Sequence, residues 1–281
     1  MTHSERKIVS KVENIFIPQN ASEWNLLGED FEAPKGIDLD AELDLYELNT
    51  THAYEVLEYT VAELLKAGEI LFLTAFGVEG CVVLKILADL RDSGKIAKNQ
   101  FITIANLDTG YQFKETLELK AKLEESYGFT INMIQPALSV TEQDTKYGKD
   151  LYKTDPDQCC YMRKLVPLAD LLQGKYAWIT SIRREQTEHR ANAQAFEYDS
   201  KFKLGKINPL IHWTKSHIWK FIHENNIPYN ALLDNGYDSI GCEPCTSPGE
   251  GRKGRWAGKD KIECGLHIQD SEMTQGGEFT I

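Results

Sequence analysis

Short apolar runs alternate with amphipathic segments along the middle of this chain, and this alternation is what most restricts its fold. Residues 70–75 and 101–107 are apolar runs of strand length, and segments with helical spacing follow them at 81–90 and 113–127. Strands buried on both faces are apolar throughout, and parallel strands need crossover connections, which are usually helical. The pattern therefore predicts an α/β fold with a doubly wound, mostly parallel sheet.

Further segments extend the same plan. The sequence predicts a helix over 54–66 that stops at Gly68, strands over 129–134 and 176–180, and a helix over 214–225 capped by Thr214. Ligands bind at the carboxyl edge of such a sheet, where loops follow strands. We therefore expect the loops 77–80, 108–110 and 181–184 to converge on one cleft.

The chain has 281 residues, enough for one large domain with extensions. Residues 1–45 are rich in acidic side chains and poor in apolar repeats, so they are treated as an N-terminal extension without assigned structure. Residues 46–245 contain the alternating elements. Residues 246–281 form a C-terminal loop and tail, of which 246–261 is rich in Gly and charge and is expected to be mobile.

The net charge of −12 argues against a general nucleic-acid binder. The apolar runs are too short to span a membrane, and residues 1–10 lack the apolar core of a secretion signal. We therefore expect a cytoplasmic protein with no membrane or nucleic-acid partner. Its basic residues gather at 183–190 and 252–261, which suits a small anion or, alternatively, solvated surface charge.

Four of the six cysteines form two tight pairs, Cys159-Cys160 and Cys242-x-x-Cys245. In a reducing compartment, clustered cysteines favour metal binding or catalysis over disulfides. Four thiolates can hold an iron–sulfur cluster, and adjacent cysteines, with Cα atoms about 3.8 Å apart, can both reach one centre. Tetrahedral zinc is the alternative, because spacing alone does not separate the two metals.

A fifth cysteine, Cys264, stands apart within Glu-Cys-Gly-Leu-His and follows several basic residues. Positive neighbours increase the thiolate fraction, which favours a nucleophile over a bystander thiol. The sixth, Cys81, falls on the apolar face of a predicted helix. It is therefore unsuited to resolve an oxidised or loaded Cys264, and another molecule must regenerate that thiol.

The loop Phe76-Gly77-Val78-Glu79-Gly80 follows a predicted strand. Glycines there let backbone N–H groups approach a phosphate at the start of a helix. The loop lacks the Gly-Lys-Ser/Thr of a Walker motif, and an ordinary turn is the alternative interpretation.

Between about residues 70 and 268 the chain resembles the assimilatory adenylyl-sulfate reductase family, whose relatives are the phosphoadenylyl-sulfate reductases. The matching stretches are 74–80, Asn106-Leu107-Asp108-Thr109-Gly110, Cys159-Cys160-Tyr161-Met162-Arg163-Lys164, Arg183-Arg184-Glu185-Gln186, 206–210, Gly241-Cys242-Glu243-Pro244-Cys245 and Glu263-Cys264-Gly265-Leu266-His267.

The resemblance implies an adenine nucleotide α-hydrolase-like fold, with 46–245 as a nucleotide-binding and iron–sulfur reductase domain. It implies one 4Fe–4S cluster on Cys159, Cys160, Cys242 and Cys245. The Cys264 thiolate would attack the sulfur of adenosine 5′-phosphosulfate (APS), releasing AMP and leaving an S-sulfocysteine. Thioredoxin or a similar dithiol protein would then release sulfite, as a step of sulfate assimilation and cysteine biosynthesis.

The resemblance also assigns residues to the substrate. These substrate-binding residues are Gly77, Leu107, Asp108, Lys164, Arg183, Arg190, Arg252, Arg255 and His267. The chain departs from the family at two positions, because Ala75 replaces a Ser and Gly80 an Asp of the strand-exit loop. These changes affect the expected side-chain contacts of the loop but leave its backbone contacts intact.

Three alternatives stay open at this point. A phosphoadenylyl-sulfate (PAPS) reductase would use the 3′-phosphorylated nucleotide, although the cluster cysteines usually accompany APS. A cluster-containing tRNA thiolation enzyme would need a Ser-Gly-Gly loop and a basic face, which this chain lacks. A zinc-stabilised binding module would lack catalysis. The sequence leaves open whether the chain forms a homo-oligomer.

Overall fold

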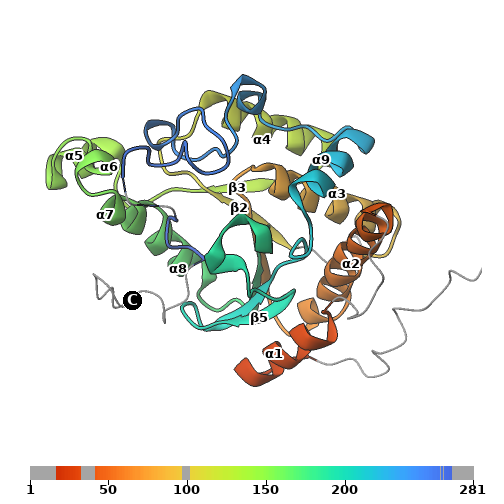
Figure 1. Ribbon diagram of the computed structural model, residues 1–281. Helices are drawn as coiled ribbons and strands as arrows, with labels where there is room; N and C mark the ends of the chain where they lie inside the picture. The colour runs from red at the N-terminus through yellow and green to blue at the C-terminus, as the bar shows by residue number, and fades with distance from the viewer. Residues whose placement is uncertain (1–16, 33–41, 97–101, 260, 262, 268–281) are drawn as a thin grey trace, which may run out of the picture.

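A six-stranded sheet forms the centre of the protein (Figure 1). The computed structural model describes residues 17–32, 42–96, 102–259, 261 and 263–267. The strands are β1 (Ile70–Leu73), β2 (Thr103–Leu107), β3 (Ile131–Ile134), β4 (Ala177–Ile179), β5 (Phe196–Asp199) and β6 (Leu204–Ile207). They lie in the order β3-β2-β1-β4-β6-β5, and only the β5–β6 pair is antiparallel. The predicted α/β fold with a mostly parallel sheet is therefore confirmed.

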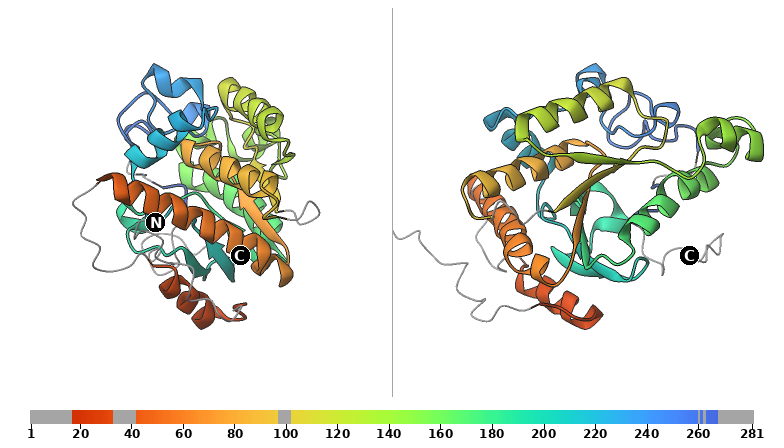
Figure 2. Two further views of the ribbon diagram at one scale, coloured as in Figure 1. Left: turned by 90° about the vertical axis from the view of Figure 1, so that its right-hand side faces the viewer. Right: turned by 180° about the vertical axis from the view of Figure 1, so that it is seen from behind.

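Helices cover both faces of this sheet (Figure 2). The α-helices are α1 (Ala21–Asp30), α2 (Glu42–Ala62), α3 (Val78–Asp92), α4 (Lys114–Tyr127), α5 (Val140–Tyr147), α6 (Leu151–Thr154), α7 (Pro156–Cys160), α8 (Val166–Leu172) and α9 (Lys215–Glu224). A π-helical turn, η3 (Tyr161–Leu165), joins α7 to α8. Short 3₁₀ turns occur at η2 (Leu64–Lys66), η4 (Arg184–Gln186), η5 (Glu188–Arg190), η6 (Ala231–Asn235) and η7 (Glu243–Cys245).

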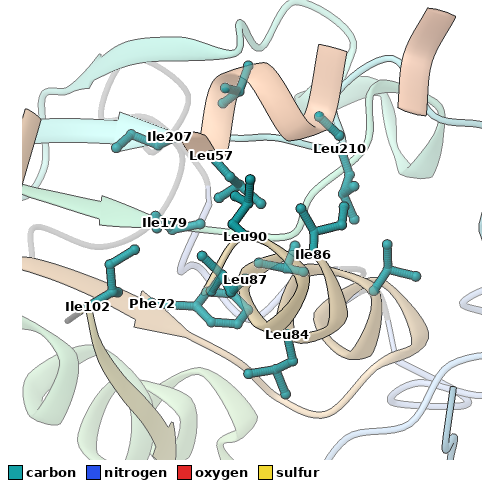
Figure 3. Close-up of a cluster of buried hydrophobic side chains, with 14 of the residues drawn as sticks. Leu57, Phe72, Leu84, Ile86, Leu87, Leu90, Ile102, Ile179, Ile207 and Leu210 are labelled. Atoms are coloured by element: carbon teal, nitrogen blue, oxygen red, sulfur yellow. The ribbon is translucent and has the colours of Figure 1, made fainter. Parts of the chain in front are cut away.

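Successive residues of β1 point to opposite faces, so the strand contributes to two cores. Ile70 and Phe72 pack into the larger core beneath α2, α3, α4 and α9 (Figure 3), whereas Leu71 packs into a smaller core with Leu168 and Leu172 of α8. Because both faces are covered, the strand is apolar at every position, which explains the continuous apolar run in the sequence.

The predicted elements over 70–134 and 176–180 are all present. The strands β1, β2 and β3 are two residues shorter than expected at one end, and β4 is one residue shorter at each end. Thr214 caps α9 as predicted, accepting a hydrogen bond from the backbone nitrogen of His217. The helix expected over 54–66 instead begins at Glu42 and ends at Ala62. Strands β5 and β6 were not predicted, because both are short and β5 mixes polar and apolar residues.

The N-terminal extension contains a packed helix. Helix α1 lies against β5 at the foot of the molecule in Figure 1, and Trp24 is buried there. The ring of Trp24 lies over Gly205 of β6, where a Cβ would come within 2.0 Å of the indole. Gly205 therefore creates the flat site that accepts α1. Within the described residues, no helix is long and apolar enough to cross a membrane.

Candidate functional site

The strand-exit loop after β1 leads directly into α3. Gly77 is the N-cap of α3, and the helix begins at Val78, so residues 78–80 belong to its first turn rather than to the predicted loop. Phe76 adopts a left-handed conformation with φ of 58°, which turns the chain sharply between strand and helix. Its backbone N–H donates a 3.1 Å hydrogen bond to the Thr74 hydroxyl. The free N–H groups of the first turn of α3 can therefore bind an anion near Gly77.

Gly80 is required by its neighbour across this turn. A Cβ on residue 80 would lie 2.4 Å from the Thr74 hydroxyl oxygen, so any larger residue there requires Thr74 or the start of α3 to shift. The aspartate of the related motif would therefore clash with Thr74. The departure at Gly80 thus has a steric explanation within this chain.

Two of the three predicted loops meet through charged contacts. Arg183, which follows β4, donates a 2.9 Å hydrogen bond to the carboxylate of Glu79 in α3, and Gln186 donates another of 2.9 Å to the same oxygen. Arg183 also pairs with Glu185. The convergence of 77–80 with 181–184 is confirmed. Because Arg183 is buried between two carboxylates, its predicted role as a substrate residue stays a prediction.

The third loop, after β2, lies against the cysteines. Leu107 ends β2 and is buried, and Asp108 accepts hydrogen bonds from the backbone nitrogen of Gly110 at 3.0 Å and from Gln135 at 3.2 Å. The Thr109 hydroxyl is 3.2 Å from the Cys242 sulfur. The loop after β2 is therefore tied to the second cysteine pair.

All four paired cysteines line one pocket. The lining residues are Tyr111, Tyr152, Pro156, Cys159, Cys160, Arg163, Lys164, Cys242, Cys245 and Trp256. Cys159 and Cys160 end helix α7, Cys242 is the N-cap of the turn η7, and Cys245 is its last residue. The backbone nitrogen of Glu243 donates a 2.7 Å hydrogen bond to the Tyr111 carbonyl, which joins η7 to the segment after β2.

The donor set of this pocket fits an iron–sulfur cluster. Burial raises the pKa of Cys159 to about 11, and the charges of Cys242 and Cys245 add to this effect. Burial likewise raises the pKa of Cys160 to about 12. Four thiols that line a shared pocket, two of them buried, provide the sulfur ligands that such a cluster needs. In the described part of the chain, no three His, Cys, Asp or Glu side chains form a site for a single metal ion.

The segment after the second cysteine pair is irregular but closely packed. Trp256 is buried, and its backbone nitrogen donates a 2.9 Å hydrogen bond to the Cys245 carbonyl. Arg255 is also buried, and its guanidinium group bonds the Ile240 carbonyl at 3.3 Å. Its Nε atom has no hydrogen-bond partner among the described residues. Arg255 therefore retains a donor for a ligand.

Cys264 lies within the electrostatic reach of this pocket. Burial acts to raise its pKa, but the charges of Lys164 and Arg255 and a hydrogen bond from the Leu266 backbone outweigh it, so the pKa is lowered. Burial acts to lower the pKa of Lys164, yet the charges of Cys242, Cys160 and Cys264 raise it. Lys164 is therefore positively charged and interacts electrostatically with both the paired cysteines and Cys264, which favours a reactive thiolate.

Arg190 and Arg252, both expected to bind the substrate, are brought together by Glu263. The Glu263 carboxylate is 2.8 Å from Arg190 Nη2 and 3.2 Å from Arg252 Nη2. Among the described residues, Arg190 Nε has no hydrogen-bond partner. The two arginines are therefore neighbours, as a shared anion site requires, and Arg190 keeps one donor for a ligand.

His267 lies at the end of the described tail. Its ring stacks on Trp178 with a centroid distance of 5.6 Å and an interplanar angle of 7°. Burial and the charges of Arg190 and Lys206 hold its pKa well below the usual range, so the ring is neutral. A neutral imidazole beside arginines can donate or accept a hydrogen bond to a bound anion.

Three residues of this region were not expected from the sequence, namely Thr109, Trp256 and Glu263. Thr109 and Glu263 lie within the motifs 106–110 and 263–267, where the sequence points first to the neighbouring thiols and basic groups because their chemistry is more specific. The signal for Glu263 was its place directly before Cys264.

The chain was compared with known proteins. The model of the phosphoadenosine phosphosulfate reductase domain matches residues 69–248. A Bacillus subtilis protein named adenosine 5′-phosphosulfate reductase 2 is 48% identical over 204 residues, which are 71% of this chain and 83% of that protein.

Two solved structures resemble the fold. The phosphoadenylyl-sulfate reductase of Candida auris has a TM-score of 0.58 and 28% identity, covering 73% of this chain and 97% of that one. The FMN adenylyltransferase of Candida glabrata has a TM-score of 0.52 and 15% identity, covering 80% and 72%. The latter shows the adenine nucleotide α-hydrolase-like fold alone. With the family match extending from β1 through both cysteine pairs, the chain belongs to the phosphoadenosine phosphosulfate reductase domain family.

Proposed function

We propose that this protein reduces adenosine 5′-phosphosulfate to sulfite and AMP. The observation that carries the proposal is the match of residues 69–248, which include both cysteine pairs, to the phosphoadenosine phosphosulfate reductase domain. The charges of Lys164 and Arg255 act on Cys264 and favour the thiolate that the reaction needs. The Bacillus subtilis relative, named for the same activity, supports the choice of substrate.

In the first half-reaction, the Cys264 thiolate attacks the sulfur of the substrate. A sulfur–sulfur bond forms, the bond between sulfur and the bridging phosphate oxygen breaks, and AMP leaves with that electron pair. The product on the chain is an S-sulfocysteine at Cys264. Lys164, Arg190 and Arg255 are proposed to attract the sulfate and phosphate groups and to stabilise the departing charge.

In the second half-reaction, an external dithiol protein of the thioredoxin class attacks the S-sulfocysteine. Its first thiolate bonds to the Cys264 sulfur, the bond from that sulfur to the sulfonate sulfur breaks, and sulfite leaves with the electron pair. Its second thiol then displaces Cys264 from this mixed disulfide, so the partner is oxidised to a disulfide and the Cys264 thiol is restored. The state of Cys81 supports the need for an external dithiol, because its side chain is fully buried in α3 and its pKa is raised by burial. It is therefore a poor candidate for an internal resolving thiol.

We propose that Cys159, Cys160, Cys242 and Cys245 hold a 4Fe–4S cluster. Their shared pocket and their all-sulfur donor set support this assignment. When bound, such a cluster supplies a fixed charge and joins η7 to α7. Lys164 lines the same pocket, and its positive charge would stabilise the Cys264 thiolate.

The test is sulfite release from adenosine 5′-phosphosulfate by anaerobically purified protein supplied with reduced thioredoxin. Iron and acid-labile sulfide are measured on the same preparation. Sulfite release together with bound iron and sulfide is the expected result. Absence of sulfite from a cluster-containing preparation contradicts the activity, whereas colourless zinc protein contradicts the cluster alone.

The nucleotide preference is tested in the same assay. The Candida auris structure is that of a phosphoadenylyl-sulfate reductase, so the 3′-phosphorylated nucleotide is the competing substrate. Comparison of kcat/KM for the two nucleotides decides between them. A strong preference for the 3′-phosphorylated form would replace the proposed substrate.

A further inference from the structure

A buried carboxylate links the cysteine-bearing tail to two arginines. Glu263 pairs with Arg190 at 2.8 Å and with Arg252 at 3.2 Å, and its side chain is only 3% exposed. The Thr187 hydroxyl lies 3.4 Å from the same carboxylate. Arg190 and Thr187 belong to the loop after β4, far from Glu263 in the sequence, so these bonds are tertiary contacts that dock the tail onto the domain.

We propose that Glu263 is a positioning residue that docks the segment 263–267 and thereby fixes Cys264 in its reactive place. The inference rests on the proposed function, in which Cys264 is the nucleophile. Adjacent Cα atoms are separated by about 3.8 Å, so a fixed Glu263 leaves Cys264 little freedom to move. Orientation of the attacking atom is a large part of catalysis by such groups.

The remaining contacts of the segment lie on the C-terminal side of Cys264. Lys201 donates a 2.6 Å hydrogen bond to the Gly265 carbonyl, and Leu266 packs against the smaller core. His267 stacks on Trp178 at the other end. Removing one partner of a buried charge pair is strongly destabilising, because the other charge is left buried and unpaired. Glu263 is therefore the dominant anchor on the N-terminal side of Cys264.

The carboxylate also keeps the two guanidinium groups side by side. Arg190 and Arg252 repel one another, and the negative charge of Glu263 offsets this repulsion. Its loss would release the tail and separate the arginines together. A neutral glutamine at 263 keeps the shape of the side chain but removes the charge that both arginines bind.

The proposal is tested by alkylation of Cys264 with iodoacetamide in the full chain with its cluster intact. Mass spectrometry of the peptide that carries Cys264 gives the rate. Glu263 itself raises the pKa of Cys264, so rates are compared on the alkaline plateau, where the thiol is fully ionised. For Glu263→Gln we expect a plateau rate increased by about tenfold or more, equivalent to a loss of about 1.4 kcal/mol of docking energy.

Turnover provides a second readout. In Glu263→Gln we expect kcat to fall by more than KM for the nucleotide rises, because the tail is released while both arginines keep their charge. The matched control is Glu250→Gln, which removes a carboxylate from an exposed ion pair. The Glu250 side chain is 84% exposed and that of its partner Lys253 is 80% exposed. This control should change neither the plateau rate nor kcat.

An unchanged plateau rate in Glu263→Gln overturns the proposal, as does a raised KM with an unchanged kcat. If that variant fails to fold, Arg252→Gln removes the partner with 25% side-chain exposure and is measured in the same way. An unchanged plateau rate in Arg252→Gln also contradicts the proposal. Alkylation requires no turnover, so its result does not depend on the proposed function. The proposed function is contradicted by a different result, namely sulfite release by Cys264→Ser.

Discussion

The guanidinium group of Arg255 lies flat against Gly241, so closely that a Cβ on residue 241 would come within 2.4 Å of the Arg255 Cζ atom. Gly241 directly precedes Cys242, and its backbone nitrogen donates a 3.2 Å hydrogen bond to the Thr246 hydroxyl. One close contact thus fixes both the loop of the second cysteine pair and an arginine expected to bind the substrate.

Gly241→Ala should therefore weaken substrate binding. The added methyl group displaces the Arg255 guanidinium, and we expect KM for the nucleotide to rise by about tenfold, equivalent to about 1.4 kcal/mol. Arg255→Lys, which keeps the charge and loses the planar fork, should have a similar effect. Steady-state kinetics measure both variants, with iron content as the check that the cluster is retained. Wild-type KM in Gly241→Ala would show that Arg255 does not contact the substrate.

Cys264→Ser should abolish sulfite release while leaving iron content unchanged, because a hydroxyl is a far weaker nucleophile than a thiolate. The matched control is Cys81→Ala, which removes a buried thiol from the core. We expect it to cost about 1 kcal/mol of stability and to retain activity. Turnover with reduced thioredoxin and urea unfolding measure the two effects. Loss of activity in folded Cys81→Ala would instead indicate a role for that thiol.

Lys164→Gln should move the pH–rate profile of Cys264 to higher pH. The lowered pKa of Cys264 keeps its thiolate populated below the usual thiol pKa of about 8.5, and Lys164 is the largest of the causes that lower it. Without that charge the pKa rises, so the acidic limb of the alkylation profile shifts upward. Lys114→Gln, which changes an exposed residue of α4, is the control and should leave the profile in place. A profile unmoved by Lys164→Gln would contradict this electrostatic account.

Gly80→Ala should destabilise the protein because its Cβ would meet the Thr74 hydroxyl at 2.4 Å. Overpacking of this kind costs about 1–3 kcal/mol. Thr74→Ala removes the clashing oxygen, so the double variant should lose less stability than the sum of the single variants. Urea unfolding of the four proteins measures the coupling. Strict additivity would show that α3 moves to accommodate the methyl group.

Much of the fold could be predicted from the sequence. The runs at 70–75 and 101–107 indicated buried parallel strands because both faces of the sheet are covered by helices. The short strands β5 and β6 and helix α1 escaped prediction. Their pairing depends on contacts between distant residues, such as Trp24 over Gly205, which leave no periodic pattern in either segment.

The residue types of the site could likewise be predicted from the sequence, whereas their contacts could not. The sequence by itself determined the chemistry of the site, because thiols, arginines and the Cys264 motif are visible as residue types and spacings. Only the tertiary structure decided which groups are neighbours: both cysteine pairs line one pocket, Thr74 excludes a side chain at Gly80, and Glu263 joins Arg190 to Arg252. The physical reason is that charge pairing and steric exclusion depend on distances in space, and the path of the whole chain sets those distances.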